Sequence, residues 1–200
     1  SRVCGIHSSH GLLDQSFDKS RFMMQNRIEL AQHFANRGFT HGAEIGVFEG
    51  YYSNVLLSHN PALTLWCIDS WGPERRRADA FAVAQQTLAP HNDRVVLMKG
   101  TSLAVAALVP DGFFDFVFID ANHSYEAVRE DVAAWAPKVR SGGIVSGHDY
   151  YPGKSYKQCG VIQAVDEYVA AHGLTLHTTP YDGNNPIKDD RQPCWYFIQP

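Results

Sequence analysis

Short apolar runs alternate along this chain with segments in which apolar residues recur at helical spacing. The clearest apolar run is Phe114–Ile119, which only one acidic residue interrupts. Continuous apolar strands of this kind are typical of parallel sheets, because helices cover both faces of such a sheet. The alternation therefore predicts an α/β domain with a doubly wound, mostly parallel sheet.

The pattern resolves into seven strands and six helices. The predicted strands are Ala43–Val47, Leu63–Ile68, Arg94–Met98, Phe114–Ile119, Gly143–Ser146, Leu174–His177 and Trp195–Ile198. The predicted helices are Phe22–Phe34, Tyr52–Ser58, Arg75–Leu88, Leu103–Leu108, Tyr125–Trp135 and Val161–Ala171. A turn-rich loop without a helical pattern joins the last two strands, which predicts an antiparallel edge strand in this seven-stranded sheet. We expect residues 1–40 to form an N-terminal arm and helix, serving as a lid or in substrate or oligomer contacts, before a single domain at 41–200.

Composition and charge narrow the classes of partner. The 200 residues carry a net charge of −4, with 44% hydrophobic and 19% charged residues, which is typical of a soluble globular domain. Domains that bind nucleic acid are usually basic, so we expect no nucleic-acid partner, and we interpret the arginines at 75–77 as the solvated start of a helix. No apolar run reaches about 18 residues, so we expect no membrane-spanning helix.

Cysteine usage bears on the compartment. Cys4, Cys67, Cys159 and Cys194 are far apart and lack the spacing of a zinc site. Cys67 lies within a predicted strand, and we expect it to be a reduced core residue. This favours a reducing compartment, so we expect a cytoplasmic protein. The N-terminal arm and an exposed edge strand also favour a homo-oligomer.

A glycine-containing turn follows the first predicted strand. Residues 44–50 read Glu-Ile-Gly-Val-Phe-Glu-Gly, and glycines at 46 and 50 allow a tight turn and a close approach of the backbone to a ligand. Asp69 ends the second strand about 20 residues later, where a carboxylate can accept hydrogen bonds from a ribose. Glu44 would repel a pyrophosphate but suits the cationic amino-acid end of S-adenosylmethionine. The pattern therefore favours S-adenosylmethionine over a dinucleotide. The alternative is that the glycines and Asp69 only shape turns.

Three longer segments carry a resemblance to a known family: EIGVFEGYYS, CIDSW and FDFVFIDANHSYEAVREDVAAWAPKVRSGGIVSGHDY. They resemble the class I methyltransferases of the small-molecule O-methyltransferase type called methyltransferase family 24, over about residues 40–172. The chain departs from the commonest pattern of such enzymes at Phe48, where a glycine is usual. The resemblance implies a Rossmann-like fold and transfer of a methyl group from S-adenosylmethionine to a hydroxyl of a sugar or natural product.

The resemblance also implies roles at the strand ends. Glu44, Gly46 and Gly50 would line the methionine end of the cofactor, and Asp69 would hold the ribose. Thr101 and Ser102 would lie near the adenine. Asp120 would face the sulfonium and the substrate. The cofactor-binding residues that we expect are Glu44, Gly46, Glu49, Gly50, Asp69, Ser70, Thr101, Ser102 and Asp120.

Polar residues end the fourth and fifth predicted strands. Adjacent strands lie about 4.8 Å apart, so Asp120, His123, His148 and Asp149 can converge. We expect Asp120, His148 and Asp149 to hold Mg²⁺ or another divalent cation. We expect His123 to act as general base, with Asp120 as the second catalytic residue. Some metal-dependent methyltransferases resemble this arrangement but have two acids where His148 and Asp149 stand, which weakens the expected attraction for Mg²⁺.

Each of these roles has an alternative. His123 precedes a helix and could serve in capping it, and His148 and Asp149 could shape their loop. We interpret Glu126, Glu130 and Asp131, together with Arg129, as the solvated face of a helix. Three tyrosines after the fifth strand could line the acceptor pocket, and the alternative is that they serve only in packing: Tyr150, Tyr151 and Tyr156.

Other functions remain open at this point. A metal-independent methyltransferase acting on another small molecule would fit the same cofactor motif. A nicotinamide-dependent oxidoreductase is disfavoured, because the chain lacks the GxGxxG pattern at this turn. A non-catalytic cofactor-binding subunit is disfavoured by the presence of Asp120, His123 and Asp149. The partner that we expect is a small hydroxylated acceptor.

Overall fold

The computed structural model describes residues 24–72, 79–151 and 160–200. The strands in these residues are β1 His41–Ile45, β2 Thr64–Asp69, β3 Val95–Lys99, β4 Phe114–Ile119, β5 Val139–Gly147, β6 His177–Thr178 and β7 Trp195–Ile198. They form one sheet in the order β3-β2-β1-β4-β5-β7-β6. β1 to β5 are parallel, and β7 is antiparallel to both of its neighbours, β5 and β6. This mostly parallel sheet with antiparallel pairing near one edge confirms the predicted fold class.

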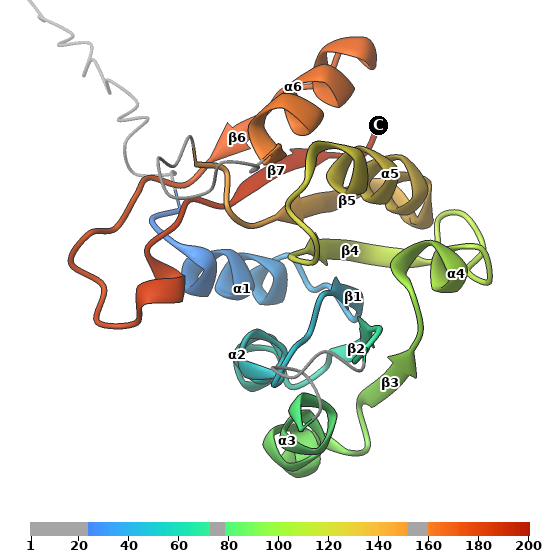
Figure 1. The fold of residues 1–200 in the computed structure, drawn as a ribbon, viewed down its shortest axis with the longest axis vertical. Helices are drawn as coiled ribbons and strands as arrows, with labels where there is room; N and C mark the ends of the chain where they lie inside the picture. The colour runs from blue at the N-terminus through green and yellow to red at the C-terminus, as the bar shows by residue number, and fades with distance from the viewer. Residues whose placement is uncertain (1–23, 73–78, 152–159) are drawn as a thin grey trace, which may run out of the picture.

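Helices cover both faces of the sheet (Figure 1). They are α1 Arg27–Asn36, α2 Tyr51–His59, α3 Ala80–Leu88, α4 Ser102–Ala106, α5 Tyr125–Trp135 and α6 Val161–Ala171, with short 3₁₀ turns η2 Ala89–His91, η3 Ala136–Lys138 and η4 Lys188–Asp190. α1, α2 and α3 lie on one face, and α4, α5 and α6 on the other. Each face has its own buried apolar cluster, as a doubly wound sheet requires.

The element bounds agree best where the apolar pattern is continuous. β4, β7, α5 and α6 have the predicted bounds. α1 begins later than predicted because the Asn26 side chain accepts hydrogen bonds from the backbone N–H groups of Ile28 and Glu29, each at 3.1 Å, and so caps the helix at Arg27. β6 is shorter than predicted, since the Leu174 N–H donates to the Val169 carbonyl and thereby closes the end of α6.

Other expectations can be compared with the described residues. Cys67 and Cys194 are buried free cysteines, which confirms the interpretation of Cys67 as a core residue. None of the helices in residues 24–72, 79–151 and 160–200 combines the length and hydrophobicity needed to cross a membrane. The arm expected at 1–20, the arginines at 75–77, Cys4 and Cys159 lie outside the described residues.

Gly46 lets the central strands β1 and β4 approach closely where both end. Its φ of +95° lies in the left-handed region, and a Cβ added there would lie 2.1 Å from the Asp120 carbonyl oxygen. The Asp120 N–H donates to the Ile45 carbonyl at 2.7 Å, and the Gly46 N–H donates to the Ile68 carbonyl at 2.8 Å. The lack of a side chain at Gly46 therefore brings the ends of β1, β2 and β4 together.

We expect Gly46→Ala to lower the free energy of unfolding by about 3 kcal/mol, because the methyl group meets a backbone that cannot easily move and the residue keeps a strained φ. Gly38→Ala is the matched control, since Gly38 also has a positive φ of 70° but has nothing within 4 Å of an added Cβ. Its expected cost is about 1 kcal/mol. Urea unfolding followed by circular dichroism measures both. Equal costs would contradict the close approach at Gly46.

Candidate functional site

A cavity of about 1020 Å³ opens at the carboxyl ends of β1, β2, β3 and β4. Ligands bind at this edge in open α/β sheets. The predicted cofactor-binding residues that line it are Gly46, Asp69, Ser70, Thr101, Ser102 and Asp120. His123 lines it too, so the predicted base faces the same space. Three predicted cofactor residues, Glu44, Glu49 and Gly50, are not in its wall.

Asp69 joins the ends of β1 and β2 through backbone hydrogen bonds. Its Oδ2 accepts from the Phe48 N–H at 2.9 Å, and its Oδ1 accepts from the Trp71 N–H at 2.8 Å. The Trp71 indole N–H donates to the Phe48 carbonyl at 2.8 Å. Asp69 thus ties the turn after β1 to the turn after β2, and it also lines the cavity.

Phe48 stands where a glycine is usual, and the structure gives the reason for that preference. Its φ is +52°, in the left-handed region that favours glycine. The two hydrogen bonds that link Phe48 to Asp69 and Trp71 hold the residue in this strained conformation. Its side chain is 45% exposed and lines the cavity, so the phenyl ring is available to a ligand.

Glu44 lies beneath the turn and is only 2% exposed. The Ser53 hydroxyl donates a hydrogen bond to its Oε2, and the Cys67 thiol donates to the Ser53 oxygen at 3.5 Å. Burial raises the pKa of Glu44 to about 8. The carboxyl of Glu44 is therefore a weaker acid than the sequence argument assumed when it relied on a negative charge there. Glu49 is exposed, and Gly50 precedes α2 with a φ of +82°.

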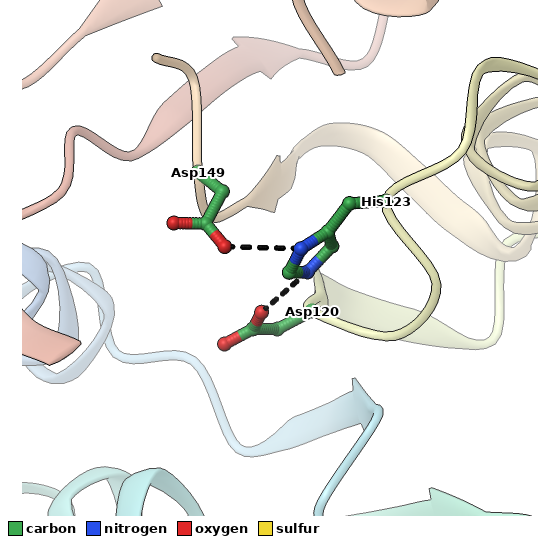
Figure 2. A group of neighbouring side chains, drawn as sticks. All are labelled: Asp120, His123 and Asp149. Carbon is green, nitrogen blue, oxygen red and sulfur yellow. Dashed lines mark hydrogen bonds and ion pairs between the residues drawn. The ribbon is translucent and has the colours of Figure 1, made fainter. Parts of the chain in front are cut away.

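Asp120, His123 and Asp149 converge beside the cavity (Figure 2). His123 Nε2 lies 3.2 Å from Asp120 Oδ1, and His123 Nδ1 lies 3.2 Å from Asp149 Oδ2. One ligand atom from each of the three residues falls within 4.8 Å of the others. His148 Nδ1 lies 3.6 Å from a carboxylate oxygen of both Asp120 and Asp149. The four residues that we expected to converge therefore do so, with His123 between the two carboxylates.

The charges in this group depend on one another. The hydrogen bond with Asp120 and the charges of both carboxylates raise the pKa of His123. Burial raises the pKa of Asp120, but the charges of His148, His123 and Arg27 outweigh burial and hold it below its usual value. Burial dominates at Asp149 and raises its pKa. Asp120 is thus the more acidic carboxyl of the two.

Arg27 is a site residue that the sequence did not reveal. It is 4% exposed, and its Nη1 lies 3.8 Å from Asp120 Oδ2. Its Nε donates to Asp190, whose other oxygen accepts from the Tyr51 hydroxyl at 2.8 Å. Burial lowers the pKa of Arg27, but the charges of Asp190 and Asp120 outweigh it, so the side chain stays charged.

The sequence held one signal for Arg27. It shares the buried face of α1 with Leu30, Ala31 and Phe34, where a basic residue is out of place. Its partner Asp190 lies 163 residues away, so no local pattern could identify the pair. The arginine comes from the N-terminal segment in which no motif was visible.

Asp131 corrects the interpretation of α5. Glu126, Arg129 and Glu130 are exposed, as expected, but Asp131 is 5% exposed and lines the cavity. It shares the buried face of α5 with Val128, Val132 and Trp135, because it lies three or four residues from two of them. The helical spacing from Val128 and Trp135 could have identified Asp131 as buried. The sequence interpretation instead grouped Asp131 with its exposed acidic neighbours.

The tyrosines expected in an acceptor pocket have other described contacts. The Tyr150 hydroxyl donates to Asp166 at 2.6 Å. Tyr151 stacks on Tyr181 with ring centroids 6.0 Å apart. Tyr156 lies outside the described residues. Tyr151, two residues after Asp149, therefore forms an aromatic pair with Tyr181 of the loop between β6 and β7.

The fold and part of the sequence match known proteins. A family model described as a methyltransferase domain matches residues 43–150. The O-methyltransferase from Bacillus cereus in complex with SAH has a TM-score of 0.66 at 18% identity, covering 86% of this chain and 80% of that chain. TomG from Streptomyces achromogenes, an O-methyltransferase involved in tomaymycin synthesis and solved in complex with SAM, has a TM-score of 0.65 at 20% identity, covering 87% and 80%. A comparison with curated proteins finds no match. At these identities the structural matches show a shared fold.

The raised pKa of Glu44 predicts a pH-dependent stability. Between about pH 5 and pH 8 the folded state holds a proton on Glu44 that the unfolded state has released, so stability falls as pH rises through this window. Glu44→Gln keeps an acceptor for Ser53 but cannot ionise. Between pH 5 and pH 8 we expect the free energy of unfolding of this variant to rise relative to that of the wild type by roughly 1 kcal/mol per pH unit. Urea unfolding at several pH values measures the difference. Glu49→Gln, at an exposed position, should keep the wild-type dependence. The same slope in Glu44→Gln and the wild type would refute the prediction.

Proposed function

The chain belongs to methyltransferase family 24, a family of class I methyltransferase domains, and from this membership we propose that it transfers the methyl group of S-adenosylmethionine to a hydroxyl of a small molecule such as a sugar or natural product. The observation that carries the proposal is the convergence of Asp120, His123 and Asp149 beside the cavity that opens at the strand ends. Membership of a methyltransferase family argues against the alternative of a nicotinamide-dependent oxidoreductase.

The cavity residues fit the proposed cofactor. Asp69 lines the cavity at the end of β2, where its carboxylate would accept hydrogen bonds from the two ribose hydroxyls, and Gly46 leaves the backbone open to close approach. Because Glu44 lies beneath the turn, we propose that it supports the methionine end indirectly through Ser53 and the first turn of α2. Glu49 is exposed in this turn, and we propose that it supplies negative charge for a cationic amino-acid group.

His123 and Asp120 are the proposed catalytic residues. When bound, S-adenosylmethionine supplies an electrophilic methyl group, which leaves deprotonation of the acceptor hydroxyl to the protein. His123 has one ring nitrogen toward each carboxylate, so in the neutral ring an acceptor hydroxyl would have to take the place of one carboxylate to give up its proton, and the other carboxylate would then stabilise the imidazolium. Its raised pKa makes it a stronger base than a free histidine. Asp120 orients the ring and lies at the end of β4 in the cavity wall.

The same residues fit a divalent cation. Asp120, His123 and Asp149 present two carboxylates and an imidazole at ligand distance from one another, and His148 Nδ1 lies 3.6 Å from an oxygen of each carboxylate. We propose that Asp120 and Asp149, with His148 or His123, would hold the ion. A cation held there would lower the pKa of neighbouring acceptor hydroxyls. The histidines favour Mn²⁺ or a softer ion over Mg²⁺.

One observation favours the metal-independent alternative. The guanidinium of Arg27 lies 3.8 Å from Asp120 Oδ2. The raised pKa of His123 favours its charged form, which would place a second positive charge beside Oδ1 of the same carboxylate. Two cationic neighbours reduce the negative charge that would attract a metal ion. We propose that α1, within the segment 1–40 that we expected to act as a lid or in contacts, serves the site through Arg27.

The first test of the proposal uses Asp120→Asn. We expect purified wild-type protein to bind S-adenosylhomocysteine in calorimetry, and the variant to bind it within about threefold of the wild type. Turnover of an accepted vicinal diol should fall about 10²- to 10⁴-fold in the variant, because the base loses its orienting charge. Asp93→Asn, on the exposed surface, is the control and should leave both measurements unchanged. No binding of S-adenosylhomocysteine by the wild type would sink the proposed function, and unchanged turnover would remove the role of Asp120.

Metal binding is a separate prediction. We expect calorimetric titration of Mn²⁺ into chelator-treated protein to show one site, and Asp149→Asn to weaken it about tenfold or more. Asp93→Asn again serves as the control. Full turnover of the wild type in excess chelator, with no Mn²⁺ binding, would instead support the metal-independent alternative.

A further inference from the structure

The segment between β6 and β7 reaches the reactive group through one buried acid. Asp190 is the last residue of η4, and its side chain is 2% exposed. η4 lies beside the start of α1 (Figure 1), where Asp190 Oδ1 accepts a hydrogen bond from Arg27 Nε. The other oxygen of Asp190 accepts from the Tyr51 hydroxyl of α2 at 2.8 Å. Both oxygens therefore have protein donors, and Asp190 is not part of the cavity wall.

Asp190 fixes the direction of the Arg27 side chain. The guanidinium carbon lies over the rings of Tyr51 and Tyr52, 5.1 Å from each ring centroid, and these contacts restrict its movement. Arginine presents its N–H groups in a rigid planar fork, so fixing Nε also fixes the two terminal nitrogens. With Nε bound to Asp190, Nη1 lies 3.8 Å from Asp120 Oδ2.

The guanidinium in turn distinguishes the two oxygens of Asp120. Oδ2 lies 3.8 Å from Arg27 Nη1, and Oδ1 lies 3.2 Å from His123 Nε2. A fixed cation on the Oδ2 side favours the rotamer in which Oδ1 faces the imidazole. His148 Nδ1, 3.6 Å from Oδ2, favours the same rotamer when it acts as a donor. The orientation of His123 thus depends on contacts that begin at Asp190.

We propose that Asp190 is a positioning residue for methyl transfer, an inference that rests on the proposed function. Through Arg27 it holds Asp120 in the orientation that presents Oδ1 to His123. It does so from outside the cavity wall, in a segment more than 60 residues after His123 in the chain. The orientation of a base is critical, because a displacement of about 1 Å caused by a remote change can lower a rate about 10²-fold.

A purely structural role for Asp190 would give a different result. Removing one partner of a buried ion pair destabilises a protein, because the other charge is left uncompensated. That loss lowers the amount of folded protein, whereas a loss of positioning lowers the turnover of the protein that is folded. Asp190→Asn keeps the shape of the side chain and an acceptor oxygen but removes the charge. Urea unfolding of each variant establishes the conditions in which it is folded, and the rates are compared there.

The test measures kcat and KM for an accepted vicinal diol, together with calorimetric binding of S-adenosylhomocysteine. In Asp190→Asn we expect kcat to fall about 10- to 10²-fold. The KM of the diol and the Kd of S-adenosylhomocysteine should stay within about twofold of the wild type, because neither ligand contacts Asp190. Asp182→Asn is the matched control in the same loop, since the Asp182 side chain accepts hydrogen bonds from Asn184 and Asn185. It should keep the wild-type kcat.

A double variant tests whether Asp190 acts through Arg27. We expect Arg27→Gln to lose at least as much kcat as Asp190→Asn, because it removes the cation itself. The double variant Arg27→Gln/Asp190→Asn should be no slower than Arg27→Gln alone, since Asp190 has no further route to Asp120 once the guanidinium is gone. Losses that multiply in the double variant would mean that the two residues act independently, and would overturn the proposal.

Nitrogen NMR of the histidine side chains provides a readout that does not depend on turnover. His123→Gln identifies the signal of His123 by its loss. We expect this signal to shift in Asp190→Asn and in Arg27→Gln, because the ring nitrogen of His123 faces Asp120. The signal should stay in place in Asp182→Asn.

The outcomes separate this inference from the proposed function. Absence of turnover in the wild type would overturn the proposed function, and the NMR signal of His123 would then decide the positioning by itself. With a wild type that turns over, an unchanged kcat in Asp190→Asn or an unmoved His123 signal would overturn the role of Asp190 alone.

A milder variant covers the case in which Asp190→Asn does not fold. Tyr51→Phe removes the hydroxyl that holds Asp190 Oδ2, at a residue that is 40% exposed. We expect this variant to fold and to lose about threefold in kcat, as the removal of one hydrogen bond predicts. An unchanged kcat in Tyr51→Phe would overturn the proposal in that case.

Discussion

Asp120 is a half-buried carboxylate just after the central strand β4, and removing a charged carboxylate from water is costly unless cations or hydrogen-bond donors surround it. Three elements meet that need. α1 brings Arg27, the loop before α5 brings His123, and the end of β5 brings His148. Arg27 is itself buried and requires Asp190, which lies between β6 and β7. Segments far apart in the chain thus meet, directly or through Arg27, at the charge of one side chain.

The sequence predicted the architecture well because the architecture depends on local patterns. Strand β4 and helices α5 and α6 have the predicted bounds, since continuous apolar runs and helical spacing are properties of short segments. β6 was predicted too long because the residues after α6 complete its C-terminal hydrogen bonds. The same logic placed Gly46, Asp69, Thr101 and Asp120 in the cavity wall, because parallel strands end at the same edge of the sheet.

The electrostatics of the site were less accessible from sequence. Glu44 has the residue type of an anion, yet the fold buries it beneath α2 and raises its pKa to about 8. Arg27 and Asp131 each interrupt an apolar helical face, but their roles depend on partners far away in the chain. Charge state and burial result from the assembled fold. For this reason residue type and spacing located the site but did not determine which groups carry charge there.

The contact between Arg27 and Asp190 has a consequence for the order in which the site is assembled. During synthesis the ribosome releases α1 and the first strands well before residue 190, and chains begin to fold from their N-terminal parts. Until the β6–β7 connection emerges, Arg27 lacks the acid that compensates for its burial, and the carboxylate of Asp120 lacks a fixed cation. A nascent chain can thus form much of its sheet before the ion pair between Arg27 and Asp190 exists. The ion pairs of the reactive centre are therefore completed only after residue 190 has been synthesised.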